Sequence, residues 1–152
     1  MQYRVATAAD VPAMVAGRLT DPSAGPPDAR MAAYLEGDHH PHHALAPRTA
    51  FIALEAEGVV GYIAGHLSRR YDCEGELQYL FVASRVRRRG IASTLLEHLA
   101  RWFVAQGAHK ICVNVDSESE AAALFYARHG ATPLHPHWLV WSDIRARSGM
   151  VR

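Results

Sequence analysis

Hydrophobic residues follow a helical period in one part of this chain and form short, separate stretches in the rest. Between residues 90 and 106 they recur every three or four positions, on one face of a helix (Ile91, Leu95, Leu96, Leu99, Trp102 and Phe103). Other apolar stretches are short and bounded by glycine, proline or charged residues, which is typical of strands. The pattern predicts strands over Tyr3–Ala6, Thr49–Glu57, Val59–Ser68, Glu74–Ala83, His109–Val115 and Ala131–Ile144, and helices over Val11–Leu19, Ala29–Leu35, Gly90–Gln106 and Glu118–His129.

The order of these elements, β-α-α-β-β-β-α-β-α-β, predicts an α/β protein in which helices pack on a mixed sheet. Proline and glycine mark the segments Asp21–Pro27 and Gly37–Pro47 as loops, and a tight turn near Glu57-Gly58 joins two strands. No repeat or linker divides the 152 residues. We therefore expect a single domain over residues 1–152.

The composition argues against nucleic acids and membranes as binding partners. The chain is 49% hydrophobic and has a formal net charge of +1, which gives little general attraction to nucleic acids or membrane surfaces. It lacks the run of about 18 apolar residues that a membrane helix needs, and its start lacks the layout of a signal peptide. Cys73 and Cys112 have no motif spacing, so we expect reduced thiols in a cytoplasmic protein.

A candidate binding site lies in residues 80–92. The apolar segment Leu80–Val82 runs into a basic turn that contains Gly90 and opens the longest predicted helix. Free N–H groups and the positive end of the helix dipole converge at such a point. Gly90 and Ala92 leave room for a phosphate to approach the backbone, and the run Arg87–Arg89 adds forked cationic donors. The segment therefore predicts a pyrophosphate site.

Two common phosphate motifs do not fit, because one requires a closing Lys-Ser/Thr pair and the other three glycines. The motif Arg-x-x-Gly-x-Ala, carried by Arg87, Gly90 and Ala92, resembles instead the acyl-CoA-binding motif of the GCN5-related N-acetyltransferase (GNAT) superfamily. A second segment resembles the family's later helix through its alanine, aromatic and glycine positions (Ala122, Phe125, Tyr126 and Gly130). The resemblance covers nearly the whole chain. It implies a mixed, mostly antiparallel sheet of six or seven strands flanked by about four helices.

The resemblance also implies how a coenzyme is held. The strand carrying Leu80, Phe81 and Val82 would splay from its neighbour at a bulge, pair with the pantetheine arm, and offer an N–H near Leu80 to the oxyanion. Main-chain N–H groups would hold the pyrophosphate along the turn (Arg87, Arg88, Arg89, Gly90, Ile91 and Ala92). Ser119 replaces an asparagine that many relatives carry, so it would make a shorter coenzyme contact, which Asn114 and Asp116 could share.

Two residues are candidates for proton transfer. Tyr126 stands where the family usually places its general acid, and a phenol keeps its proton at neutral pH; alternatively it is a tyrosine at the core edge. Several family members use a glutamate in the position of Glu76 as general base. Even spacing places Glu76 on the same face as Leu80 and Val82. Glu76 could instead be a surface charge at the strand end, as could Glu74.

The resemblance thus implies an acetyl-CoA-dependent N-acetyltransferase that acts on a primary amine of a small molecule or peptide. Direct attack in a ternary complex is expected, because neither cysteine is expected near the bulge. The alternative is a non-catalytic acyl-CoA-binding or regulatory module with the same fold. We expect acetyl-CoA as co-substrate, and no nucleic-acid or membrane partner; the aromatic C-terminal strands could supply a homodimer interface.

The run His39–His43 has three interpretations: a metal site, a loop beside the acceptor pocket, or a solvated loop. Adjacent imidazoles can chelate, but Pro41 imposes an extended loop and structural sites usually draw on separated segments. We therefore expect no metal. Near the end of the chain, alternation places Trp138 and Trp141 on different faces, so at least one packs on the core.

Overall fold

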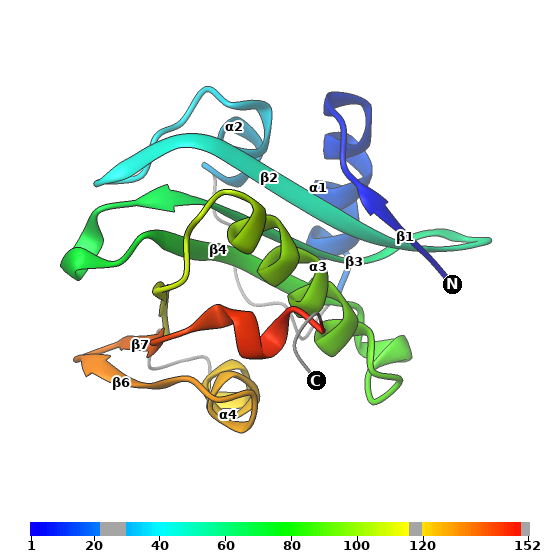
Figure 1. Cartoon of the computed structure of the whole chain (residues 1–152). Helices are drawn as coiled ribbons and strands as arrows, with labels where there is room; N and C mark the ends of the chain where they lie inside the picture. The colour runs from blue at the N-terminus through cyan, green and yellow to red at the C-terminus, as the bar shows by residue number, and fades with distance from the viewer. Residues whose placement is uncertain (22–29, 116–119, 150–152) are drawn as a thin grey trace.

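The structure of the protein is a computed structural model that describes residues 1–21, 30–115 and 120–149. In this part of the chain seven strands form one sheet in the order β1-β2-β3-β4-β5-β7-β6. The β4–β5 pair is parallel and the other neighbouring pairs are antiparallel. Four α-helices pack on the sheet (Figure 1). The mixed, mostly antiparallel architecture expected from the resemblance is confirmed.

The strands are β1 (Gln2–Val5), β2 (Ala44–Glu55), β3 (Gly58–Ser68), β4 (Gly75–Val82), β5 (Ile111–Asn114), β6 (Thr132–His135) and β7 (Trp138–Trp141). The helices are α1 (Val11–Leu19), α2 (Met31–Glu36), α3 (Ile91–Ala105) and α4 (Glu120–Arg128). Short 3-10 turns are η1 (Ala8–Asp10), η2 (Arg70–Asp72), η3 (Ser84–Val86) and η4 (Ile144–Arg147). Among the described residues, no helix is long and apolar enough to cross a membrane.

Two elements differ from the sequence prediction. Strand β2 begins at Ala44, well before the predicted Thr49, because a register shift around Ala46-Pro47 lets the ladder continue past the proline. The stretch Ala131–Ile144, predicted as one strand, folds back on itself as the β6–β7 hairpin and then enters η4. Pro136 lies in the turn of that hairpin, where a missing N–H breaks no ladder bond.

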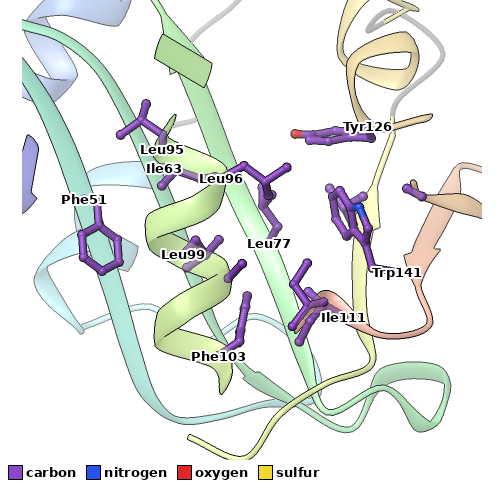
Figure 2. Close-up of a cluster of buried hydrophobic side chains, with 14 of the residues drawn as sticks. Phe51, Ile63, Leu77, Leu95, Leu96, Leu99, Phe103, Ile111, Tyr126 and Trp141 are labelled. Carbon is purple, nitrogen blue, oxygen red and sulfur yellow. The ribbon is translucent and has the colours of Figure 1, made fainter. Parts of the chain in front are cut away.

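Each face of the sheet has its own apolar core. Helices α3 and α4 cover one face, where a large cluster includes residues drawn in Figure 2 (Ile63, Leu77, Leu95, Leu99, Phe103, Tyr126 and Trp141). Helices α1 and α2 cover the other face with a smaller cluster (Met14, Met31, Ile52, Tyr62 and Phe81). Alternation along the strands supplies both cores, since neighbours such as Tyr62 and Ile63 point to opposite faces.

Two glycines of β3 let α3 lie close to the sheet. A Cβ added at Gly61 would lie 3.4 Å from side-chain atoms of both Ile91 and Leu95. A Cβ added at Gly65 would lie 3.1 Å from the Phe103 ring. Because Gly61 and Gly65 lack side chains, the side chains of α3 pack directly against the backbone of β3. This close packing positions α3, and the turn that precedes it, on the sheet.

We expect Gly65→Ala to lower the free energy of unfolding by about 1–3 kcal/mol, as overpacking of a core does. The new Cβ would lie 2.8 Å from the backbone oxygen of Glu76. Gly17→Ala is the matched control: its nearest contact would be the Val59 oxygen at 3.8 Å, and alanine in α1 should raise stability by up to about 1 kcal/mol. Urea denaturation measures both; wild-type stability of Gly65→Ala would contradict the close packing.

Candidate active site

Strand β4 changes its pairing at Gln78. Up to Leu77 it pairs with both β3 and β5, and beyond that point it has no partner in the described part of β5. Ala64 of β3 pairs with Tyr79, whereas the next residue of β3 pairs with Leu77, so Gln78 is an extra residue that forms a β-bulge. Among the described residues, the segment Leu80–Val82 consequently has no partner strand on the side from which β5 has separated, although Arg87 Nε donates to the Val82 carbonyl.

The bulge overturns one expectation from the sequence. Even spacing predicted Glu76, Leu80 and Val82 on one face. Leu80 and Val82 pack against the core beneath α3, whereas Glu76 lies on the opposite face with Tyr79 and Phe81. The extra residue shifts the alternation by one position, so the prediction of a shared face was wrong.

Glu76 is a buried carboxylate, only 3% exposed, with two nitrogen groups against it. Arg70 Nε donates a hydrogen bond to Glu76 Oε1 at 3.1 Å, and His66 Nε2 lies 3.8 Å from the same oxygen. Burial raises the pKa of Glu76, and the charge of Arg70 opposes that rise. The alternative of a surface charge was therefore wrong: this carboxylate is buried, oriented, and easier to protonate than an exposed glutamate.

Glu74 has a different role. Its exposed carboxylate accepts hydrogen bonds from the backbone N–H groups of His109 at 2.9 Å and Lys110 at 3.1 Å, and these bonds lower its pKa. They attach the start of β5 to the start of β4. Glu74 therefore stabilises the junction of the two strands before they separate.

Tyr126 lies on the α3–α4 face, 4% exposed, with its ring edge-on to Trp141 at 5.6 Å. In Figure 2 its hydroxyl points toward β4. Burial raises the pKa of Tyr126, so the phenol holds its proton at neutral pH. Trp141 is the core tryptophan, whereas Trp138 lies on the opposite face beneath the Arg70 guanidinium, 4.5 Å from the ring centre. Tyr126 and Glu76 thus flank β4 from opposite faces of the sheet.

The two cysteines lie closer to the site than the sequence suggested. Cys112 of β5 pairs with Glu76 of β4, and Cys73 packs beside it. The expectation that neither cysteine lies near the bulge was therefore wrong. A hydrogen bond with Cys73 and burial raise the pKa of Cys112, so its thiol stays protonated and is a poor nucleophile.

The turn before α3 presents backbone N–H groups. Arg88 and Gly90 both have left-handed backbone angles, with φ of +67° and +78°. The Thr94 N–H makes the first bond of the helix, to the Gly90 carbonyl at 3.0 Å, so the N–H groups of Ile91 and Ala92 have no helical acceptor. A Cβ added at Gly90 would meet no heavy atom within 4 Å.

The arginine side chains of the turn are less available than the sequence suggested. Arg89 Nη1 lies 3.0 Å from Glu55 Oε1 at the end of β2, and Arg85 contacts the same carboxylate at 3.5 Å. Arg87 Nε donates to the Val82 carbonyl at 3.2 Å. The turn therefore offers backbone N–H groups as donors beside arginines of which two are held by Glu55. Ser119, the remaining predicted coenzyme contact, lies outside the described residues.

Sequence reasoning missed three residues of this site, Tyr34, His66 and Arg70. His66 of β3 lies opposite Glu76 of β4 in the sheet. The Tyr34 hydroxyl of α2 lies within hydrogen-bond distance of His66, and Arg70 of η2 forms an ion pair with Glu76. The available signal was one histidine within the otherwise apolar stretch Val59–Ser68. Its partner could not be identified, because the register across a bulge is not given by the hydrophobic pattern.

The histidine run borders the same site. Arg70 Nη2 donates to the His42 carbonyl at 2.9 Å, and Arg48 Nη1 donates to the His39 carbonyl at 2.7 Å. The part of the chain that the structure describes holds no group of three or more His, Cys, Asp or Glu placed to bind a metal ion. The run therefore forms a loop attached to the site that contains Glu76.

Solved structures of other proteins share this fold. The model of the acetyltransferase (GNAT) family matches residues 18–131. The structure of an acetyltransferase of the GNAT family from Staphylococcus aureus Mu50 superposes with a TM-score of 0.75 at 13% identity, covering 94% of this chain and 98% of that one. Ribosomal-protein-alanine N-acetyltransferase from Brucella melitensis biovar Abortus 2308 superposes with a TM-score of 0.66 at 18% identity, covering 88% of this chain and 94% of that one.

A third structure contains a bound co-substrate. It is a protein assigned as a streptothricin acetyltransferase from Bacillus anthracis str. Ames, in complex with acetyl coenzyme A, with a TM-score of 0.54, 15% identity and coverage of 63% and 60%. These structural likenesses concern the fold, whereas the family match spans most of the sequence and includes both the turn and α4. The chain belongs to the acetyltransferase (GNAT) family.

Proposed function

We propose that this protein transfers an acetyl group from acetyl-CoA to a primary amine of a small molecule or peptide, by direct attack within a ternary complex. The observation that carries the proposal is the bulged strand β4, which holds the buried Glu76 and leads into a turn with left-handed residues before α3. The GNAT family uses acetyl-CoA, whose thioester supplies the carbonyl that the amine attacks. Family membership supports the transfer chemistry, and the acceptor class is our inference.

Two segments fit the co-substrate. The edge of β4 at Leu80–Val82, which has no partner strand in the described part of β5, would pair with the pantetheine arm, as an added strand does. The N–H groups from Arg87 to Ala92 would hold the pyrophosphate beside Gly90, where an added Cβ meets no neighbouring atom, and Ser119 would add a contact. The Leu80 N–H would stabilise the oxyanion of the thioester carbonyl.

Proton transfers are assigned to residues on the two faces of the sheet. Glu76 would accept a proton from the incoming ammonium group, directly or through water, which its raised pKa favours. Tyr126 would give its proton to the departing thiolate. Because β4 and β5 separate beyond Leu77, groups on both faces can reach a thioester that lies between these strands.

The alternative, a non-catalytic acyl-CoA-binding or regulatory module, would use the same turn without these proton transfers. Thiol release from acetyl-CoA, followed with and without a panel of primary amines, separates the two functions. Release that depends on an amine supports the enzyme. Binding of coenzyme A without amine-dependent release supports the module.

The turn can be tested through its glycine. We expect Gly90→Ala to weaken coenzyme A binding at least about tenfold, because a side chain at this left-handed position strains the turn and occupies the phosphate space. Gly107→Ala is the matched control, since Gly107 also has an open left-handed conformation, with φ of +77°, at the other end of α3. Calorimetry measures both affinities. Equal binding by the two variants would refute the assigned phosphate site.

The base can be tested by pH. Wild-type kcat/KM should fall as the pH drops through the Glu76 pKa, which lies above the ordinary glutamate value of about 4.3. We expect Glu76→Gln to lose about a hundredfold in kcat/KM near neutral pH and much less in alkali, where the amine deprotonates unaided. Glu74→Gln, which removes a nearby carboxylate, should keep the wild-type profile. The same loss at every pH would leave Glu76 a structural role only.

The Tyr126→Phe variant distinguishes the two possible roles of Tyr126, general acid and packed core residue. The variant keeps the packed ring and removes only the hydroxyl, so stability and coenzyme A affinity should stay close to wild type. We expect kcat to fall by about tenfold to a hundredfold, because the thiolate then leaves without a proton donor. Steady-state kinetics with a saturating amine measures this effect. An unchanged kcat would show that Tyr126 serves the core alone.

A further inference from the structure

A chain of buried polar side chains lies behind Glu76. The Tyr34 hydroxyl of α2 is 2.7 Å from His66 Nδ1 of β3, and His66 Nε2 is 3.8 Å from Glu76 Oε1 of β4. The side chain of His66 is fully buried, and that of Glu76 is 4% exposed. Three separate elements thus place a phenol, an imidazole and a carboxylate next to one another in that order.

The contacts of His66 determine which ring nitrogen carries the proton. Burial, together with the nearby charges of Arg48 and Arg70, lowers the pKa of His66 to about 4, so the ring is neutral at neutral pH. Burial raises the pKa of Tyr34, so its hydroxyl remains available as a donor to Nδ1. The proton of the neutral ring then lies on Nε2, toward the carboxylate. The other tautomer would place a lone pair opposite Glu76.

The Nε2 group of His66 has no hydrogen-bond partner among the described residues, although it is buried. A buried donor without an acceptor costs folding free energy, so the position of this N–H group needs a physical explanation. Its nearest acidic partner is Glu76 Oε1, slightly beyond hydrogen-bond distance. Arg70 contacts the same oxygen from the more open side, where its own side chain is 19% exposed.

We propose that His66, oriented by Tyr34, is a positioning residue that keeps the Glu76 carboxylate ionised and directed at the acceptor amine. The inference rests on the proposed function of Glu76 as the base. His66 moves no proton in this scheme: the proton passes from the ammonium group to Glu76, while the Nε2–H dipole favours the charged carboxylate before that transfer.

Other ionisable groups surround the pair and must stay constant in any test. Arg48 lies over the Tyr34 ring at 4.8 Å from its centre, and Tyr79 stands edge-on to Tyr34 at 5.4 Å. The groups that act on Glu76, His66 or Tyr34 from the packed elements are Arg48 (β2), Arg70 (η2), Tyr79 (β4), Cys112 (β5) and Cys73 before β4. The variants below leave all of them in place.

The test compares three variants with a matched control. His66→Phe fills the ring space without an N–H, His66→Gln restores a donor, and Tyr34→Phe removes the hydroxyl that fixes the tautomer. Tyr62→Phe is the control, because Tyr62 is a fully buried tyrosine of β3 whose hydroxyl donates to the Met31 sulfur at 2.9 Å. Two measurements are made: the pH profile of kcat/KM, and the titration of the Glu76 carboxyl by carbon-13 NMR, with Glu76→Gln identifying its signal.

We expect His66→Phe to move the acid limb of kcat/KM and the Glu76 titration upward by about one pH unit. Tyr34→Phe should move both by less, His66→Gln should return both toward wild type, and Tyr62→Phe should move neither. A His66→Phe variant that loses stability while both titrations stay at the wild-type pH overturns the proposal. If the wild-type protein acetylates no amine, the proposed function fails, and the NMR titration still decides the coupling between His66 and Glu76.

Discussion

One extra residue in β4, Gln78, is the constraint on which the site depends. Its insertion ends the pairing of β4 with β5 and reverses the alternation of side chains along the strand. Leu80 and Val82 can therefore keep their apolar side chains under α3 while the strand edge beside them has no partner strand among the described residues. Glu76 is directed to the other face, where Arg70 and His66 contact it. An unbulged strand would direct this carboxylate at the apolar core beneath α3, where an unpaired charge is costly.

The parts of the structure that follow from local pattern could be predicted from the sequence. The amphipathic period of Gly90–Gln106 gave α3, and the strand–turn–helix motif at Arg87, Gly90 and Ala92 gave both the family and the turn. Errors arose where the outcome depended on register. The face of Glu76 and the nearness of Cys112 both follow from pairings across β4, which no spacing rule supplies.

The polar cluster around Glu76 shows why the rest of the site was not predictable. Its members come from α2, β2, β3, η2 and β4, and each side chain is unremarkable within its own segment. Arg48 joins the cluster to the histidine run, donating to the carbonyls of both Tyr34 and His39. Such a group becomes visible only when the sheet and α2 are assembled. The low dielectric between them then makes each of its contacts stronger than it would be in water.

The ion pairs between the turn and the β2–β3 hairpin have a consequence for selectivity. Arg85 and Arg89 already contact Glu55, and Arg85 also contacts Glu57, so two of the four arginines in residues 85–89 are paired with carboxylates. A polyanion such as duplex nucleic acid gains affinity when cationic side chains displace the counterions condensed on its phosphates, and arginines already paired with carboxylates contribute less to that gain. A compact diphosphate would gain in addition from the fixed amide dipoles of the turn. Added electrolyte should consequently weaken coenzyme binding less than nucleic-acid binding, since the fixed geometry of the amide groups contributes to holding the diphosphate.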